Sequence, residues 1–351
     1  MISIIIAGGS GTRLWPLSTP SYPKHLLKVN GNSKSLLQNT YERIKNFSSA
    51  VYVITEKSHA HLVKAQLPEL KPDNFIVEPA RRGTASCIIA GLAKISNLVD
   101  KNEAIAFVAA DHYVRDAKGF EYSFNIAQEV SNQEKRIVLV GVEPDSPATG
   151  FGYIEKGNIF DEQRLIYDVK AFKEKPSYNK AQKYLKSGNY LWNCSYFVGS
   201  LNTFLSCMEK YAPNLNEGYN KLVKTKTEDQ YNKVYLSFEN IAIDYALIER
   251  VKNLLVVPAS FDWMDLGSFA DLHKAVDSDE DGNHQKGYVE VVESTNAFIQ
   301  NHLNTPVAVI GLDNVTVVAT KDGILVARKD MSQAVGDVAK KIHKNQEMKG
   351  E

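Results

Sequence analysis

The sequence has few of the features that mark secreted or disulfide-stabilised proteins. It contains only three cysteines, Cys87, Cys194 and Cys207, without a CxxC or Cys/His spacing. An odd number without such spacing argues against a disulfide framework or a structural zinc site and is typical of a protein in a reducing cytosol. We therefore expect a cytoplasmic location.

Long apolar runs and an excess of one charge are also missing. The apolar run at the N-terminus, residues 2–6, is too short for a signal peptide or a membrane helix, and no later stretch approaches about 18 apolar residues. Lys and Arg number 41, as do Asp and Glu, so the formal net charge is zero. No overall basic field attracts nucleic acid or an anionic membrane, and neither is expected as a partner. Any anionic ligand must be bound by local groups.

The sequence does have enough apolar residues for a large core, at 44% of the chain. Short β-branched runs alternate with helical periodicity in the first half. Alternation of this kind predicts an α/β fold with a mainly parallel sheet, whose ligand sites lie at the carboxyl ends of the strands. The expected strands are 2–6, 51–55, 75–77, 104–109 and 137–142, and the expected helices are 36–47, 58–67, 84–99 (with Thr84 as N-cap) and 119–130.

The pattern changes after Gly150. Hairpin-like strands surround one short helix up to Gly199, helices follow over 201–251, and a strand is expected at 254–257. The acidic, turn-rich run DSDEDGN (277–283) is the expected boundary between a domain of residues 1–280 and a segment of residues 281–351. In that segment, short strands separated by Asp-Asn and Asp-Gly turns are consistent with a few coils of a parallel β-solenoid, closed by a helix over 332–343.

A glycine-rich loop directly follows the first strand. It reads AGGSGTR and consists of Ala7, Gly8, Gly9, Ser10, Gly11, Thr12 and Arg13. Its spacing matches neither a P-loop nor a dinucleotide-binding fingerprint. A glycine pair alone is more often a structural turn. Three glycines with Ser, Thr and Arg after a first strand favour an anion-binding loop, because backbone N–H groups and a guanidinium both suit phosphate. Lys24 follows closely and can join them.

Two carboxylates are candidates for a Mg²⁺ site. Asp111 follows the strand at 104–109, and Asp265 lies in the run WMDLGS (263–268). Mg²⁺ prefers one or two carboxylates together with phosphate oxygens. Each aspartate can instead cap the helix that follows it, and the sequence leaves both interpretations open.

A charged run, FKEKP (172–176), contains Glu174 and Lys175. Such a cluster is ordinarily a solvated strand end. If it faces a cleft, the lysine can bind a sugar phosphate and the glutamate can accept hydrogen bonds from sugar hydroxyls.

Taken in order, these motifs resemble the sugar nucleotidyltransferases, and the LWPLS extension resembles the mannose-1-phosphate guanylyltransferases in particular. The resemblance covers nearly the whole chain. Its motifs are AGGSGTRLWPLS (7–18), YPKHLL (22–27), VEPARRGTA (77–85), AADH (109–112), TGFGYI (149–154), FKEKP (172–176), WNCSYF (192–197), AIDYALIER (242–250), FDWMDLGSF (261–269), DGN (281–283) and VAVIGLDNVTVVATKDGILVARKD (307–330).

The resemblance implies a Rossmann-like nucleotidyltransferase domain with a short left-handed β-helical tail. It implies GTP and mannose 1-phosphate as substrates and Mg²⁺ as cofactor. Separately from the resemblance, the exposed strands of the C-terminal segment and its final helix favour a homodimer formed through that segment. The implied phosphate and catalytic groups are Arg13 and Lys24, with the Gly8–Arg13 loop cradling the triphosphate, and the implied metal ligands are Asp111 and Asp265. The nucleobase is expected near Glu78, Pro79, Gly83 and Thr84, and the sugar phosphate near Gly150, Tyr153, Glu174, Lys175 and Asn193.

The chain departs from the family pattern at four places. His25 and Leu26 replace Gln-Phe, Gly83 replaces Asn, Ala109 replaces Pro, and Cys194-Ser195 replaces Ser-Gly. Two alternatives therefore stay open: the same reaction with another sugar 1-phosphate or nucleotide, and a non-catalytic module with this fold.

Overall fold

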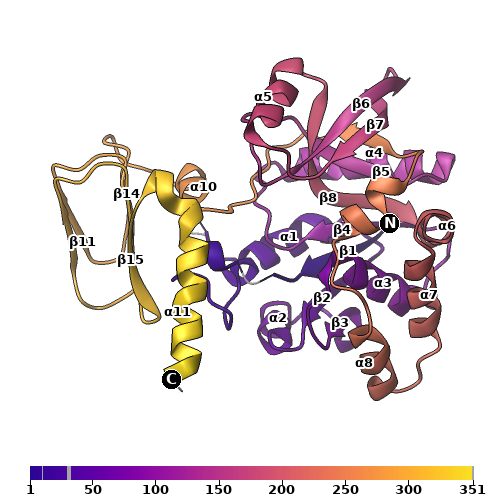
Figure 1. Cartoon of the computed structure of the whole chain (residues 1–351), viewed down its shortest axis with the longest axis horizontal. Helices are drawn as coiled ribbons and strands as arrows, with labels where there is room; N and C mark the ends of the chain where they lie inside the picture. The colour runs from indigo at the N-terminus through magenta and orange to yellow at the C-terminus, as the bar shows by residue number, and fades with distance from the viewer. Residues whose placement is uncertain (10, 30–32, 350–351) are drawn as a thin grey trace. The chain divides into compact units, whose positions relative to one another are not determined.

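The computed structural model describes residues 1–9, 11–29 and 33–349 (Figure 1). These residues form two compact units. Unit 1 comprises Met1–Gly8, Thr40–Ala110 and Val114–Trp263, and unit 2 comprises Gly9–Asn39, Asp111–Tyr113 and Met264–Glu351. The predicted division of the sequence into residues 1–280 and 281–351 stays a prediction.

Unit 1 is built on one nine-stranded sheet in the order β3-β2-β1-β4-β8-β5-β9-β7-β6. β1 to β4 pair in parallel, and β5 and β9 also pair in parallel. β8 runs antiparallel between β4 and β5, and β6 and β7 form an antiparallel ribbon. The strands are β1 (Ile2–Ala7), β2 (Ala50–Glu56), β3 (Phe75–Glu78), β4 (Ala104–Ala109), β5 (Val138–Val142), β6 (Gly152–Asp161), β7 (Ile166–Lys173), β8 (Tyr190–Ser200) and β9 (Leu255–Pro258).

Helices cover both faces of this sheet. Successive side chains of a strand point to opposite faces, and in β8 Phe197 joins the core under α3 and α6 while Tyr196 packs against Phe120 of α4. The side chain of Ser200 begins α6 by accepting a hydrogen bond from the N–H of Thr203 at 3.1 Å. The helices are α1 (Leu36–Lys45, shared by both units), α2 (Ala60–Gln66), α3 (Gly83–Ile95), α4 (Ala117–Glu134), α5 (Tyr178–Ser187), α6 (Leu201–Tyr211), α7 (Pro213–Val223), α8 (Glu228–Leu236) and α9 (Ile243–Ala246).

Unit 2 contains stacked parallel coils of β structure. β10 (His284–Lys286), β12 (Phe298–Asn301) and β14 (Val315–Thr320) pair in parallel, as do β11 (Val289–Val292) and β13 (Val307–Ile310). Thr295 bonds Asp313 and Asn296 bonds Asn314, each across 18 residues, which is the length of one coil. The predicted parallel solenoid is therefore present. Its last strand, β15 (Gly323–Arg328), instead turns back antiparallel on β14.

The rest of unit 2 packs the N-terminal loop region onto α10 (Phe269–Ala275) and α11 (Val335–Lys349). Leu14 and Trp15 share a core with Leu266, Phe269 and Val335. A side chain at Gly323 would collide with the Trp15 ring, so the glycine lets the ring lie on the β14–β15 turn.

Three predicted helix limits are corrected. Thr84 is not an N-cap, because the helix already begins at Gly83 and the Thr84 hydroxyl instead accepts a hydrogen bond from the N–H of Ile243 at 2.9 Å. That helix ends at Ile95 rather than residue 99. The terminal α-helix begins at Val335, since Ser332 lies in a 3₁₀ segment and its hydroxyl bonds back to the Lys329 carbonyl.

Candidate functional site

The glycine-rich loop leaves the end of β1. Ala7 and Gly8 belong to unit 1, whereas Gly9 and the residues from Gly11 to Arg13 belong to unit 2. Ser10 lies outside the described residues. Gly9 and Gly11 have φ of 92° and 58°, values that favour glycine. Among the described residues, none has an atom within 4 Å of where a side chain of Gly8 or Gly9 would stand, so none of them blocks the backbone there. At Gly11 a side chain would collide with Lys24, so the glycine permits close packing of the loop on that lysine.

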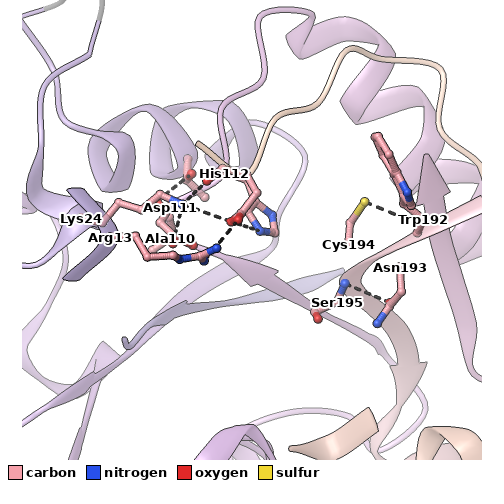
Figure 2. A network of polar contacts seen from close by, with 11 residues as sticks. Arg13, Lys24, Ala110, Asp111, His112, Trp192, Asn193, Cys194 and Ser195 are labelled. Atoms are coloured by element: carbon pink, nitrogen blue, oxygen red, sulfur yellow. Dashed lines mark hydrogen bonds and ion pairs between the residues drawn. The ribbon is translucent and has the colours of Figure 1, made fainter. Parts of the chain in front are cut away.

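The predicted catalytic residues Arg13, Lys24, Asp111 and Asp265 come together within unit 2 (Figure 2). The Lys24 ammonium lies 3.0 Å from Oδ2 of Asp111 and 3.1 Å from Oδ1 of Asp265. It also donates a hydrogen bond to the backbone carbonyl of Asp265. Arg13 reaches the other side of the Asp265 carboxylate at 3.7 Å, with half of its side chain exposed. We call these four residues the cation–carboxylate cluster.

The cluster keeps its buried charges ionised. Lys24 is only 6% exposed, and burial by itself disfavours the ammonium, yet the two aspartates raise the pKa of Lys24 above its ordinary value. For Asp111 burial again opposes ionisation, and the Lys24 ammonium outweighs it and lowers the pKa of the carboxyl to about 2. At neutral pH Lys24 and Asp111 are therefore both charged.

The alternative roles of the two aspartates as helix caps are excluded. Ser268 caps α10, since its hydroxyl accepts from the N–H of Asp271, and Asp116 caps α4. Within the described residues no group of three or more Asp, Glu, His or Cys side chains is arranged to hold a metal ion. Asp111 and Asp265 nevertheless converge on one cation, the Lys24 ammonium. Two carboxylates of this kind fit Mg²⁺, which takes its other ligands from water and phosphate.

A second polar cluster lies in unit 1 and contains Glu174, Lys175, Asn193 and Asp244. Lys175 bonds Glu174 at 2.6 Å, and the amide of Asn193 donates to Asp244 at 2.7 Å. The Glu174 side chain is 9% exposed, and its second carboxylate oxygen has no hydrogen-bond partner within the described residues. A side chain at Gly152 would collide with that oxygen, so the glycine makes room for it. We call these four residues the hydroxyl-facing cluster, because its acceptors suit sugar hydroxyls.

The Asp244 carboxyl of this cluster is harder to ionise than an ordinary aspartate. Burial, followed by the negative charge of Glu174, raises the pKa of Asp244 to about 6. The Lys175 side chain is more than half exposed; burial lowers its pKa, but the hydrogen bond and charge of Glu174 outweigh this and raise it overall. The backbone of Lys175 has a positive φ of 43°, which turns the chain sharply after β7.

Asn193 also holds the irregular part of β8 that departs from the family pattern, where the pairing with β5 shifts register (Figure 2). Its side-chain oxygen accepts from the N–H of Ser195 at 3.0 Å, and Ser195 has φ of 54°. Glycine adopts this backbone region without strain, so the family's Ser-Gly suits the irregularity better than Cys194-Ser195. Cys194 is 2% exposed and fills the core, as expected of a small apolar side chain.

The remaining predicted sugar residues differ in accessibility. Nothing lies within 4 Å of where a side chain of Gly150 would stand, so its backbone is approachable. Tyr153 is fully buried, and its hydroxyl donates to the Ala148 carbonyl at 2.8 Å. Tyr153 therefore holds the backbone at Ala148 in place, two residues before Gly150.

The residues predicted near the nucleobase also differ in accessibility. Glu78 is 6% exposed and accepts a hydrogen bond from the Tyr235 hydroxyl. Burial raises the pKa of its carboxyl to about 7. Pro79 lies in the turn after β3. Gly83 is the first residue of α3, where it has φ of 74° and a side chain would collide with the Ile241 carbonyl. This contact explains the departure at Gly83, because Asn tolerates the backbone angle but lacks the space.

Asp244 was missed by the sequence reasoning. It stands on the four-residue helix α9, and the hydroxyl of Thr84 holds the N–H of the preceding residue, Ile243. Thr84, α9 and Asn193 therefore form one connected path across unit 1. The only sequence signal was a single acidic residue within the apolar part of AIDYALIER, a motif that the family resemblance contains.

Comparisons with known proteins agree with this geometry. Residues 2–282 match the family model described as nucleotidyl transferase, so the chain belongs to the nucleotidyl transferase family and is an enzyme of that class. Residues 287–342 match the model of the MannoseP isomerase/GMP-like β-helix domain.

Individual relatives show which members of the family this chain resembles. A mannose-1-phosphate guanylyltransferase of Klebsiella pneumoniae is 32% identical over 99% of this chain and 74% of its own length. The alginate biosynthesis protein AlgA of Pseudomonas fluorescens is 34% identical over 95% of this chain and 70% of its own length. A crystal structure from Thermus thermophilus, described as a mannose-1-phosphate geranyltransferase, is 26% identical with a TM-score of 0.86, covering 97% of this chain and 99% of that one.

Proposed function

We propose that the protein transfers GMP from GTP to α-D-mannose 1-phosphate, giving GDP-mannose and pyrophosphate. The observation that carries the proposal is the cation–carboxylate cluster, held together in a chain that matches mannose-1-phosphate guanylyltransferases over nearly its full length. A copy without catalysis has no physical need to keep a buried lysine between two carboxylates.

In this reaction an oxygen of the sugar phosphate attacks the α-phosphorus of GTP in line, and pyrophosphate leaves. The attacking oxygen is already ionised at neutral pH, so no side chain has to act as nucleophile. The two anionic substrates repel each other, and catalysis consists mainly of positioning and charge neutralisation. Arg13, half exposed, and Lys24 supply positive charge to the triphosphate.

Asp111 and Asp265 are the proposed holders of Mg²⁺. When bound, the ion would neutralise phosphate charge in the transition state. Their present partner, the Lys24 ammonium, holds both carboxylates in position with a single charge. The low pKa of Asp111 keeps that carboxylate ready to bind a cation at neutral pH.

The hydroxyl-facing cluster is the proposed mannose site. The unpartnered oxygen of Glu174 can accept a hydrogen bond from a sugar hydroxyl. Asp244 fixes Asn193, and the exposed Lys175 can pair with the sugar phosphate. The approachable backbone at Gly150 completes the set, with Tyr153 behind it.

For the guanine base, we propose that the backbone of the Glu78–Gly83 turn makes the contacts. The Glu78 side chain is turned inward to Tyr235 and is better suited to hold that turn in place. The Thr84 hydroxyl is used by Ile243. Base recognition would therefore come from main-chain groups of Pro79 to Gly83.

A panel of substrates tests the proposal. Purified protein with Mg²⁺ receives GTP, ATP, UTP or dTTP, each with mannose 1-phosphate or glucose 1-phosphate, and the nucleotide sugar formed is identified by chromatography. We expect GDP-mannose as the main product. A higher kcat/KM with another pair would contradict the substrates while keeping the reaction class, and no turnover with any pair would favour a non-catalytic module.

A homodimer through the C-terminal segment and a cytoplasmic location belong to the same proposal. Ile324 and Val326 on β15, and Ile310 on β13, each expose more than half of their side chains, which suits a contact between copies. All three cysteines are buried, and none forms a disulfide with another described residue, which suits a reducing compartment. The described residues include no helix long and apolar enough to cross a membrane. Ile324→Lys should shift the molecular mass measured by light scattering toward that of a monomer. An unchanged dimer mass would mean that the interface lies elsewhere.

A further inference from the structure

Unit 2 contains a cavity of about 480 Å³ that shares no residue with either cluster. Ligand pockets for small molecules commonly have volumes of about 300–1,000 Å³. One side of the cavity comes from the segment between Arg13 and Val29, and the other comes from α10 and the β-helical coils. Its lining includes Leu17, Tyr22 and Leu27 on the first side and Val276, Lys286 and Gln300 on the second.

The cavity lining combines buried apolar residues with exposed cations. Pro16, Val29 and Leu272 are buried, and we call such residues its base. Lys28, Lys286 and Lys321 are exposed, and we call them its rim; among the described lining residues Asp322 is the single acidic one. Gln300 adds a polar group and accepts a hydrogen bond from His302 at 3.2 Å when that ring nitrogen carries the proton. An apolar base with positive charge at its edge suits a flat apolar or aromatic ligand that bears an anionic group.

The same segment carries both catalytic cations. Tyr22 and Leu27 line the cavity, and Lys24 lies between them in the chain. The N–H of Leu27 donates to the Lys24 carbonyl at 2.9 Å, and the Tyr22 hydroxyl donates to the Leu26 carbonyl at 3.1 Å. The position of Lys24 is thus tied by short hydrogen bonds to residues that a ligand would touch.

Arg13 is tied to the cavity in a comparable way. It lies in the 3₁₀ turn Thr12–Leu14, and the N–H of Leu17, a lining residue, donates to the Leu14 carbonyl at 2.8 Å. A displacement of the lining would therefore be passed to both cations through the main chain.

We infer that this cavity is a regulatory site for an aromatic or apolar anion, and that its occupation displaces the Lys24 turn and slows the reaction. The inference of binding stands on the cavity alone, and the effect on rate rests on the proposed function. Ligands with this chemistry include nucleoside phosphates and aryl carboxylates. The probe in the first test is likewise an aromatic anion.

Binding is measured with 8-anilinonaphthalene-1-sulfonate, a fluorescent aromatic anion, without added nucleotide, and the cavity variants distinguish this site from the nucleotide site. We expect saturable binding that Val276→Trp, which fills the cavity, weakens at least about tenfold. Lys286→Glu reverses one rim charge and should weaken it about threefold. Lys274→Glu, an exposed lysine of α10 outside the cavity, is the matched control and should leave the affinity unchanged.

Each variant's thermal unfolding is recorded, and Lys286→Glu keeps the test valid should Val276→Trp fail to fold. Equal binding by wild type and both cavity variants would overturn the site. Binding lost together with a change from dimer to monomer in Lys286→Glu would also overturn it, because the face would then be a contact between copies.

Coupling to the reaction is tested by covalent occupation. The native cysteines are all buried, so Lys286→Cys introduces a single exposed thiol that can be labelled with a benzyl methanethiosulfonate. We expect the label to lower kcat for pyrophosphate release at least about threefold, and reduction with dithiothreitol to restore it. Labelled Lys274→Cys should be unaffected. Retained kcat after complete labelling of Lys286→Cys would overturn the coupling, whereas an inactive unlabelled wild type would count against the proposed function and leave the binding result intact.

Discussion

Each polar cluster contains one lysine and two carboxylates, but the pKa of an aspartate is lowered in the first cluster and raised in the second. In unit 2, one buried lysine lies within about 3 Å of two aspartates, and the pKa of Asp111 falls to about 2. In unit 1, two buried carboxylates share one lysine that is mostly exposed, and the pKa of Asp244 rises to about 6. The central cation keeps the first pair ionised, as the proposed binding of metal and phosphate requires. The second pair has no buried cation between its carboxylates in the described part of the chain, which suits its proposed role as an acceptor of hydrogen bonds from neutral hydroxyls.

Asp111→Asn breaks the first arrangement and should have the largest effect. It removes one carboxylate from the proposed metal site and should lower kcat at least about 10²–10³-fold, as loss of an electrostatic stabiliser does. Pyrophosphate release measures the rate, and circular dichroism checks that the fold is retained. Asp116→Asn, at the cap of α4, is the control and should keep most of the activity. A near-normal rate for Asp111→Asn at ordinary Mg²⁺ would remove this residue from the metal site.

Asp244→Asn tests the second arrangement through pH. The pKa of Asp244 is raised in the folded state from 3.8 to about 6, so the folded protein holds a proton that the unfolded chain releases. The free energy of unfolding of the wild type should therefore fall, by about 3 kcal/mol from this group, as pH rises from about 4 to 6, and stay lower above it. In Asp244→Asn this contribution is absent.

Urea unfolding of both proteins between pH 4.5 and 7.5 provides the comparison, because the other titrating groups cancel in the difference. Asp229→Asn, an exposed carboxylate of α8, is the control. Parallel stability curves for wild type and Asp244→Asn would show that Asp244 is ionised freely in the folded protein.

These two clusters also show how far sequence reasoning reached. The glycine loop, the aspartate after β4 and the aspartate before α10 were predicted, because each follows or precedes an element whose periodicity is local and clear. Their contacts with Lys24 are made within unit 2 and were not predictable from spacing. The parallel β-solenoid predicted for the segment 281–351 was confirmed over residues 284–320, since apolar alternation and Asp-containing turns are local signals.

Asp244 and the inward turn of Glu78 could not be predicted in this way. Both depend on helices α8 and α9 docking on the end of β3 and on Asn193 of β8, which are contacts between segments far apart in the sequence. Thr84 looked like an N-cap for the same reason: its true partner is the N–H of Ile243, 159 residues away. Propensity and spacing contain no information on such partners.

Lys175→Ala should have a moderate effect confined to the sugar. Its ammonium is the exposed cation of the hydroxyl-facing cluster, so its loss should raise the KM for mannose 1-phosphate about tenfold, with little change in the KM for GTP. Lys173→Ala, at the end of β7 and exposed, is the matched control. A raised KM for GTP with an unchanged KM for the sugar phosphate would exchange the roles of the two clusters.

Ser195→Gly should have the smallest effect and a stabilising sign. Ser195 has φ of 54°, and glycine adopts that conformation at a lower cost. The gain should be up to about 1 kcal/mol in the free energy of unfolding, reduced by the larger entropy of glycine in the unfolded chain. Chemical denaturation measures it. Destabilisation by more than that amount would mean that the serine side chain makes a contact of its own worth more than the backbone strain.

The most direct test of the central claim is pyrophosphate release from GTP and mannose 1-phosphate as Mg²⁺ is removed and restored. With both substrates saturating, we predict turnover with Mg²⁺, loss to background with excess EDTA, and recovery when Mg²⁺ is added back. A rate that is unchanged in EDTA, or no turnover of this substrate pair with Mg²⁺, would contradict the assignment of the cation–carboxylate cluster to metal-dependent guanylyl transfer.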